Sequence, residues 1–267
     1  MIDMAFAYRY FETHRQAILD DWFALLRIPT VGADPKRLGE CARATAWLKK
    51  FLKPLGFEVE ILTPGSGLPV PVLVAERPGR EGVPTVLFYG HYDVQPEDPL
   101  ADWQTPPFEP TLIEGRVYAR GAQDNKGQVF GFLQGVKALV EAGESLPTIK
   151  LVLEGQEESG SSALNDLAPI LRQRLQADVM MVSDTSCAAD GRPSIVAGLR
   201  GVRHFTVTLT GPDYDLHSGV HGGVAPNPAQ GMAALLASLH TADGAIAVEG
   251  FGDRVHHPAA DEMAIAR

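Results

Sequence analysis

Apolar residues recur at the spacing of a helix face in several stretches of the chain. The first stretch ends just before Pro29, and Gly56 follows the second as a C-terminal cap. Cys41 lies on the apolar face of the second stretch, so we expect it in the core. The spacing predicts helices over residues 5–27, 35–55, 126–142, 161–175 and 227–240.

Between these helices the pattern changes to alternating or continuous apolar residues, as is typical of strands. It predicts strands over residues 57–61, 70–76, 85–89, 148–154 and 179–182. Strands that alternate with helices predict an α/β domain of three layers with a mostly parallel sheet. In such sheets ligands bind beyond the carboxyl ends of the strands, so polar residues at those ends are of particular interest.

The pattern changes again near residue 200. Residues 203–210 alternate cleanly between apolar and polar, which predicts an antiparallel strand with one face open to water. A Gly-rich loop follows over residues 211–223, and the tail from residue 250 shows neither a helix cap nor a closing strand. We therefore predict one domain over residues 1–199 and an incomplete α+β domain over residues 200–267.

Composition narrows the possible functions. The 267 residues carry a net charge of −10, which argues against a nucleic acid or an anionic membrane as the main partner. Two cysteines are too few for a disulfide scaffold or a Cys-type zinc site. The first 20 residues mix charges among apolar positions, unlike a signal peptide, and no apolar run reaches the roughly 20 residues needed to cross a bilayer. We expect a cytoplasmic protein.

One histidine and several carboxylates stand at strand ends or before a helix: His91, Asp93, Asp124, Glu157, Glu158 and Asp184. Each has a simpler explanation when taken alone, since Asp124 could cap a helix and the two glutamates could form a solvated loop. The coincidence of His91 with four carboxylates, Asp93, Glu157, Glu158 and Asp184, at one edge of one sheet favours a metal site. Histidine and carboxylate ligands suit zinc, with manganese or cobalt as possible substitutes.

The spacing of these residues suggests which of them bind a metal and which contact a ligand or a bound water. His91 and Asp93 are two positions apart and point to the same side of an extended segment, so one can bind a metal while the other holds the imidazole ring. Glu157 and Glu158 are adjacent and diverge, so one can bind metal while the other faces a bound water. Asp184 ends an apolar strand, where a carboxylate needs a cation, donors or water.

Four stretches, in order, resemble the signatures of the M20 metallopeptidases. They are residues 90–96 (GHYDVQP), 120–127 (RGAQDNKG), 154–160 (EGQEESG) and 183–184 (SD). Two further stretches, residues 103–108 (WQTPPF) and 215–220 (DLHSGV), most resemble the carnosinase-like cytosolic dipeptidase branch. The resemblance implies that residues 1–199 belong to a catalytic domain and that residues 200–267 are part of a lid and dimerisation domain.

The resemblance also implies a role for each site residue. His91 and Asp184 would hold one zinc ion, Glu158 the other, and Asp124 would bridge the two. Asp93 would orient His91, and Glu157 would be the general base for a water activated by both metals. The family further implies a cis peptide bond between Asp124 and Asn125.

His217 would come from the lid of a partner subunit in a homodimer and stabilise the developing oxyanion; the alternative is an ordinary loop histidine. In the family the chain returns to the catalytic domain after the lid and supplies a further metal-binding histidine and substrate-binding residues. Nothing after Asp184 fits that histidine. We therefore expect this sequence to be an N-terminal fragment that is inactive or impaired on its own.

The reaction predicted from these features is metal-dependent hydrolysis of the amide bond of dipeptides or short peptides. One alternative is an amidohydrolase that acts on N-acyl amino acids. Another is a non-catalytic binding or dimerisation protein on the same scaffold. The last is disfavoured because Glu157 is present and has no evident structural duty.

Overall fold

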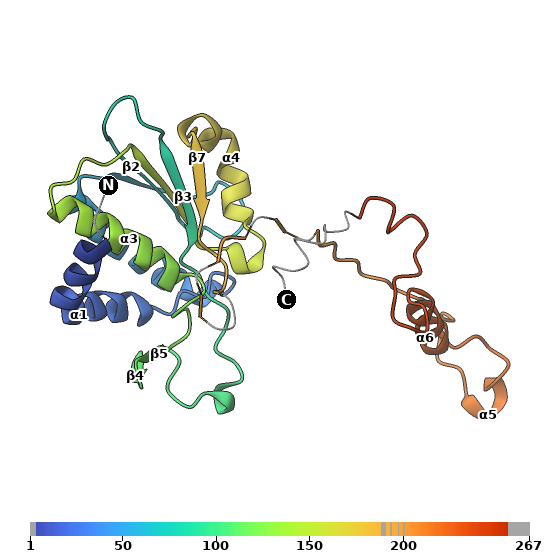
Figure 1. The fold of residues 1–267 in the computed structure, drawn as a ribbon. Helices are drawn as coiled ribbons and strands as arrows, with labels where there is room; N and C mark the ends of the chain where they lie inside the picture. Colours follow the sequence, from blue (N-terminus) through green and yellow to red (C-terminus); the bar gives the residue numbers. More distant parts are fainter. Residues whose placement is uncertain (1–3, 188–190, 193, 197, 200, 256–267) are drawn as a thin grey trace. The chain divides into compact units, whose positions relative to one another are not determined.

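The computed structural model describes residues 4–187, 191–192, 194–196, 198–199 and 201–255. The chain divides into two compact units, residues 1–196 and residues 197–267 (Figure 1). Among the described residues no helix combines the length and the apolar character needed to span a bilayer.

The first unit is built on a five-stranded sheet in the order β1-β2-β6-β3-β7. Its strands are β1 (Glu58–Leu62), β2 (Val72–Arg77), β3 (Val86–His91), β6 (Ile149–Glu154) and β7 (Val179–Val182). Strand β3 runs parallel to both its neighbours, whereas β2 is antiparallel to β1 and β6. Every strand except β2 therefore points the same way, which confirms the predicted mostly parallel sheet.

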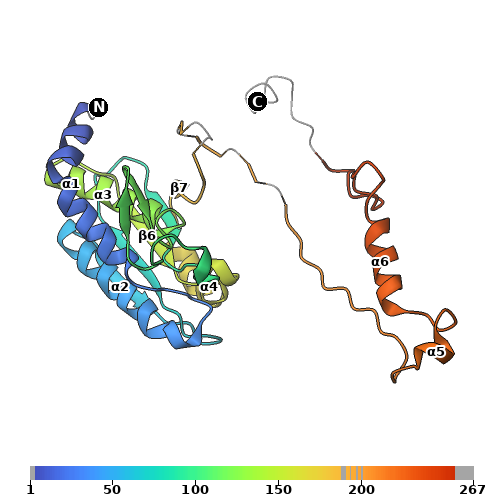
Figure 2. The ribbon, with the colours of Figure 1, turned by 90° about the horizontal axis from the view of Figure 1, so that it is seen from below.

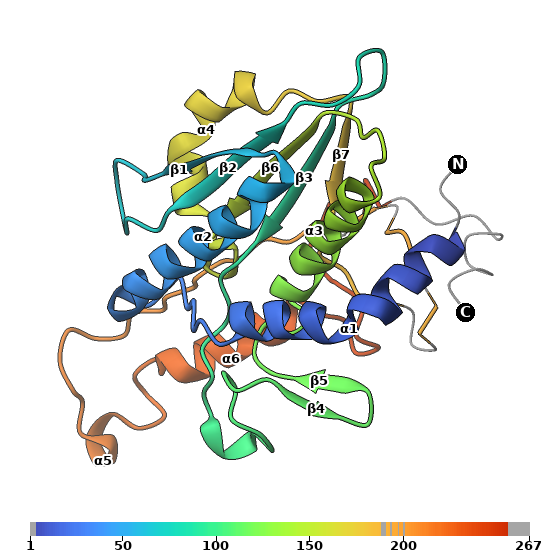
Figure 3. The same cartoon turned by 90° about the vertical axis from the view of Figure 1, so that its left-hand side faces the viewer.

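Helices cover both faces of this sheet, giving the predicted three layers. Figures 2 and 3 show α1 (Met4–Leu26), α2 (Leu38–Leu52) and α3 (Lys126–Glu141) on one face; Figure 1 shows α4 (Ser162–Arg174) on the other. The main core joins the first three helices to inward residues of β3 and β6, such as Phe88 and Leu151. A smaller core lies beneath α4, where Leu167 packs near Val74 and Val152. Adjacent residues of β2 and β3 face opposite cores, so both faces of these strands are buried, which explains the near-continuous apolar runs that predicted them.

A short hairpin between β3 and α3 is absent from the sequence prediction. Strands β4 (Thr111–Ile113) and β5 (Arg116–Tyr118) pair antiparallel. Glu114 and Gly115 form the two-residue connection, and both have positive φ, 49° and 80°. Two such residues in succession are the requirement of the commonest tight hairpin turn. The strands are too short for their alternation to stand out in the sequence.

The second unit corrects one prediction. Residues 203–210, expected to form an antiparallel strand, are exposed and pair with nothing among the described residues of this unit. A strand is stabilised by hydrogen bonds to a neighbour, so alternation alone does not produce one. The described part of the unit contains instead α5 (Ser218–His221), α6 (Pro228–Ser238) and an isolated bridge between His240 and Ile246. Asn227 caps α6 by accepting the Ala229 N–H, and Pro228 occupies its first turn.

Candidate metal centre

The predicted ligands meet where the parallel strands end. His91 is the last residue of β3, Asp184 follows β7, and Asp124 precedes α3. His91 Nε2 lies 3.1 Å from Asp124 Oδ1 and 3.5 Å from Asp184 Oδ2. One potential ligand atom from each of these three residues lies within 4.8 Å of the other two. Residues from three separate parts of the chain thus converge on a volume small enough for one cation.

The imidazole of His91 is the buried centre of this group. Its side chain is 0% exposed, and Nε2 makes no hydrogen bond to any residue that the structure describes, although two carboxylates lie near it. A third carboxylate oxygen, Glu157 Oε2, lies 3.9 Å from the same nitrogen. A buried polar atom without a hydrogen bond is costly, and a cation bound by Nε2 and the carboxylates would remove that cost. The donor set therefore fits a divalent metal.

Asp93 contacts the other side of the ring. Its Oδ1 lies 3.2 Å from His91 Nδ1, and both side chains are fully buried. The same carboxylate accepts the backbone N–H groups of Glu157 (3.3 Å, to Oδ1) and Glu158 (3.2 Å, to Oδ2). Asp93 therefore links the histidine to the short 3₁₀ turn, Glu157–Ser159, that carries both glutamates.

The charges around His91 determine its protonation. Burial lowers the pKa of the ring, but the hydrogen bond that the ring donates to Asp93 and the charges of Asp93, Asp184 and Glu157 outweigh burial and raise that pKa to about 9. Burial also raises the pKa of Glu157, with the His91 charge opposing it. Such a concentration of negative charge around one buried ring favours a cation, whether a proton or a metal.

Glu158 and His217 are not among the three clustered residues His91, Asp124 and Asp184. Glu158 Oε2 accepts a hydrogen bond from Gln95 Nε2 at 2.8 Å. His217 lies in the second unit, where its exposed side chain caps α5 by accepting the Gly219 N–H at 3.1 Å. The structure thus brings together His91, Asp93, Asp124, Glu157 and Asp184.

Two residues without an assigned role in the sequence prediction are fully buried beside the centre. The Asp124–Asn125 peptide bond is cis, as expected, and Asn125 contacts both β3 and the segment after β7. Lys126 donates from Nζ to the carbonyls of Ile28 (2.6 Å) and Leu25 (3.3 Å) at the end of α1, and burial lowers its pKa to about 7. Polar residues directly after Asp124, at the start of an apolar helix, were the available sequence signal.

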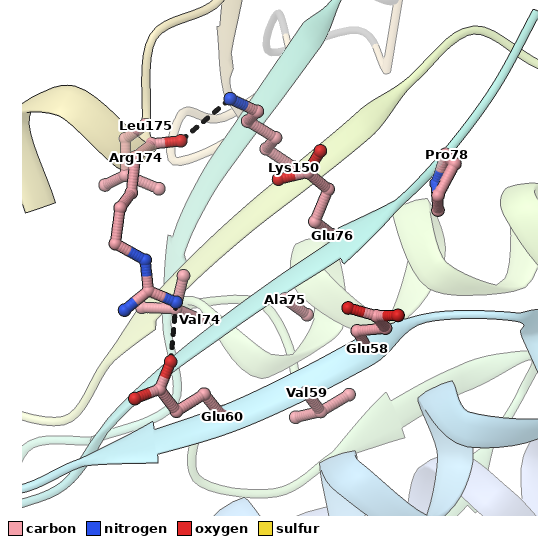
Figure 4. A pocket seen from close by; sticks show the side chains of 10 residues that line it. All are labelled: Glu58, Val59, Glu60, Val74, Ala75, Glu76, Pro78, Lys150, Arg174 and Leu175. Atoms are coloured by element: carbon pink, nitrogen blue, oxygen red, sulfur yellow. Dashed lines mark hydrogen bonds and ion pairs between the residues drawn. The ribbon is translucent and has the colours of Figure 1, made fainter.

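A cavity of about 430 Å³ lies elsewhere in the first unit, over β1, β2 and the start of β6 (Figure 4). The two basic side chains that line it, Lys150 and Arg174, already have hydrogen-bond or ion-pair partners. Lys150 donates to the carbonyls of Arg174 and Gln176 at 2.8 and 2.9 Å, and Arg174 pairs with Glu60 at 2.6 Å. None of the predicted site residues lines it.

The sequence is similar to a known peptidase family and to individual members of it. The sequence model of peptidase family M20/M25/M40 matches residues 87–260. The Beta-Ala-His dipeptidase of Homo sapiens is 35% identical over 262 residues, covering 93% of this chain and 52% of that protein. The Cys-Gly metallodipeptidase of Schizosaccharomyces pombe is 37% identical over 196 residues, covering 72% of this chain and 41% of that protein. The chain spans about half the length of the curated relatives it matches.

Solved structures of similar proteins have the same fold. The crystal structure of human carnosine dipeptidase 1 superposes with a TM-score of 0.72 at 29% identity, over 98% of this chain and 58% of that one. The M20 family metallo-carboxypeptidase Sso-CP2 from Sulfolobus solfataricus superposes with a TM-score of 0.76 at 29% identity, over 93% of this chain and 55% of that one.

Proposed function

The chain belongs to peptidase family M20/M25/M40, and on this premise we propose that it carries the metal centre of a metal-dependent dipeptidase. The observation that supports this most directly is the buried His91 Nε2, which has no hydrogen bond within the described part of the chain and faces the carboxylates of Asp124 and Asp184. The curated relatives reported above are named as dipeptidases acting on Beta-Ala-His and Cys-Gly. These names favour a dipeptide substrate over an N-acyl amino acid.

His91 and Asp184 would hold one divalent ion, Asp124 would bridge to a second ion, and Glu158 would bind that second ion. Two zinc ions are our specific proposal, with manganese or cobalt as substitutes, because the ligands combine one imidazole with carboxylates. Metals bound in this way polarise a carbonyl group and make water a nucleophile at neutral pH. Glu158 would exchange its hydrogen bond with Gln95 for the metal.

The protein's own groups would handle the proton and the orientation of the ligands. Glu157 lies beside the ligands, and its raised pKa suits a general base that takes a proton from water and gives it to the leaving amine. Asp93 would hold the His91 ring with Nε2 directed at the metal. His217, from a partner subunit, would stabilise the oxyanion in a homodimer located in the cytoplasm.

The first test is metal binding by the purified chain. We expect divalent zinc or cobalt to bind to the unaltered chain and to be lost with His91→Ala, as measured by equilibrium dialysis with elemental analysis. His14→Ala serves as a control, because His14 lies on α1 and its ring hydrogen bonds to the Tyr10 carbonyl. Equal metal content in the His91→Ala chain would rule out the centre.

The second test concerns the reaction. The test uses a chain of its relatives' full length, because residues 1–267 span about half of that length and are expected to be inactive or impaired alone. Beta-Ala-His and Cys-Gly dipeptides are compared with N-acyl amino acids of similar size, in the presence of each metal. Hydrolysis restricted to the dipeptides supports the proposal. A preference for the N-acyl compounds would identify the amidohydrolase alternative. Metal binding without hydrolysis of either class would favour the binding protein.

A further inference from the structure

Asn125 is fully buried, and its side chain joins three segments that meet at the metal centre. Its Oδ1 accepts the backbone N–H of His91 at 3.1 Å. Its Nδ2 contacts the Ser183 carbonyl at 2.7 Å and Asp184 Oδ1 at 3.1 Å, in the segment after β7. The same nitrogen also lies 2.8 Å from Gln128 Oε1.

These partners fix which way the amide faces. The backbone N–H of His91 can only donate, so the atom beside it must be the oxygen. The Ser183 carbonyl can only accept, so the atom beside it must be the nitrogen. One Asp184 oxygen is therefore held by a hydrogen-bond donor, while its other oxygen faces His91 Nε2 at 3.5 Å.

The Asn125 side chain accepts no hydrogen bond from the backbone of the helix that follows it. It occupies the N-cap position of α3, where an asparagine side chain commonly accepts a hydrogen bond from the first turn, but here it makes no capping bond. The position is also built to admit this side chain. A Cβ at Gly90 would lie 2.9 Å from Asn125 Oδ1 and 2.5 Å from a methyl group of Val129, so only glycine leaves the space.

We propose that Asn125 is the positioning residue for Asp184: it fixes the carboxylate so that its free oxygen is presented to the cation beside His91. This inference rests on the metal centre of the proposed function. It adds a residue that acts through Asp184 and does not itself bind the metal. Groups that hold a metal ligand in place in this way commonly contribute about 10–100-fold to metal affinity.

The experiment uses Co²⁺ alone as the probe, because its visible absorption reports the ligands around it. Binding and spectrum are compared for the unaltered chain, Asn125→Ala and Asn125→Asp. Asn125→Asp keeps the acceptor for the His91 N–H but removes the donor to Asp184. We expect both variants to bind Co²⁺ about 10–100-fold more weakly, with an altered spectrum. Gln134→Leu is the matched control, because Gln134 is a buried amide on α3 whose side chain has no hydrogen-bond partner among the described residues.

A double-substitution cycle separates positioning from general damage. If Asn125 acts through Asp184, adding Asn125→Ala to Asp184→Asn should cause little further loss of Co²⁺ affinity. Additive losses would overturn the inference, as would recovery of the normal spectrum and affinity in Asn125→Asp. If the unaltered chain binds Co²⁺ and the Asn125 variants bind it equally well, only this inference fails. If the unaltered chain does not bind Co²⁺, the proposed function fails with it.

Discussion

Asp93 Oδ1 lies 3.2 Å from His91 Nδ1, on the side of the ring away from Asp124 and Asp184. Because Asp93 also accepts the N–H groups of Glu157 and Glu158, one buried carboxylate constrains two parts of the candidate centre. The negative charge of Asp93 raises the pKa of the His91 ring, and its contact with Nδ1 orients the ring so that Nε2 faces the other carboxylates.

Asp93→Asn should therefore weaken metal binding more than the loss of one exposed charge would. The substitution preserves size but removes the negative charge, and the single oxygen of the amide can replace only one of the two carboxylate oxygens that accept the N–H groups of Glu157 and Glu158. We expect Co²⁺ affinity to fall about 10–100-fold, as measured by calorimetric titration. Asp166→Asn is the control: Asp166 also accepts a backbone N–H, from Gly65 at 2.7 Å, but is exposed and belongs to α4. Equal affinities for the two variants would contradict the role given to Asp93.

Glu157→Gln should separate metal binding from catalysis. The amide cannot accept a proton from water, so in a chain of its relatives' full length we expect kcat for dipeptide hydrolysis to fall about 10²–10⁴-fold. Co²⁺ affinity should change only a few-fold, since the ligands remain. Steady-state kinetics and Co²⁺ titration measure the two quantities. A variant that keeps its kcat would show that Glu157 is not the base.

The sequence was sufficient to predict much of this centre because parallel strands end at a common edge. His91 and Asp184 could be placed together from the order of strands and helices, and the resemblance to the M20 metallopeptidases added Asp124. The fold class followed from the same alternation of periods. The prediction succeeded because strong apolar patterns locate the strands and helices next to each of these polar residues.

Features that depend on exact backbone placement could not be predicted. The hydrogen bonds from Glu157 and Glu158 to Asp93 require a particular turn after β6, and no residue pattern specifies it. The role of Asn125 depends on the space left by Gly90. The predicted strand over residues 203–210 was wrong because its alternation carried no information about a pairing partner.

Cys41 should make the stability of the folded chain fall at high pH. Burial, followed by the nearby charge of Asp93, raises the pKa of its thiol from 9.0 to about 11. The folded state therefore keeps a proton that the unfolded chain releases above pH 9. Stability is retained below that pH and is lost between about pH 9 and 11, by at most about 1.4 kcal/mol per unit.

Urea unfolding between pH 8 and 10.5 measures this loss. Cys41→Ala should flatten the dependence on pH, although the cavity lowers stability at every pH. Cys187→Ala is the matched control, because that thiol is exposed, and it should leave the slope unchanged. Equal slopes for the two variants would show that Cys41 is not responsible.

Two identical substitutions on neighbouring elements should have opposite effects on stability. Gly90→Ala places a methyl group 2.5 Å from Val129 and 2.9 Å from Asn125, so β3 or α3 must shift. We expect a loss of about 1–3 kcal/mol and weaker Co²⁺ binding. Gly131→Ala adds the same methyl group to an exposed position inside α3 with nothing within 4 Å, where alanine is favoured over glycine by about 1 kcal/mol. Urea unfolding and Co²⁺ titration of both variants measure the difference. A harmless Gly90→Ala would show that the space beside Asn125 is not tightly filled, and would weaken the case that this amide is held in one orientation.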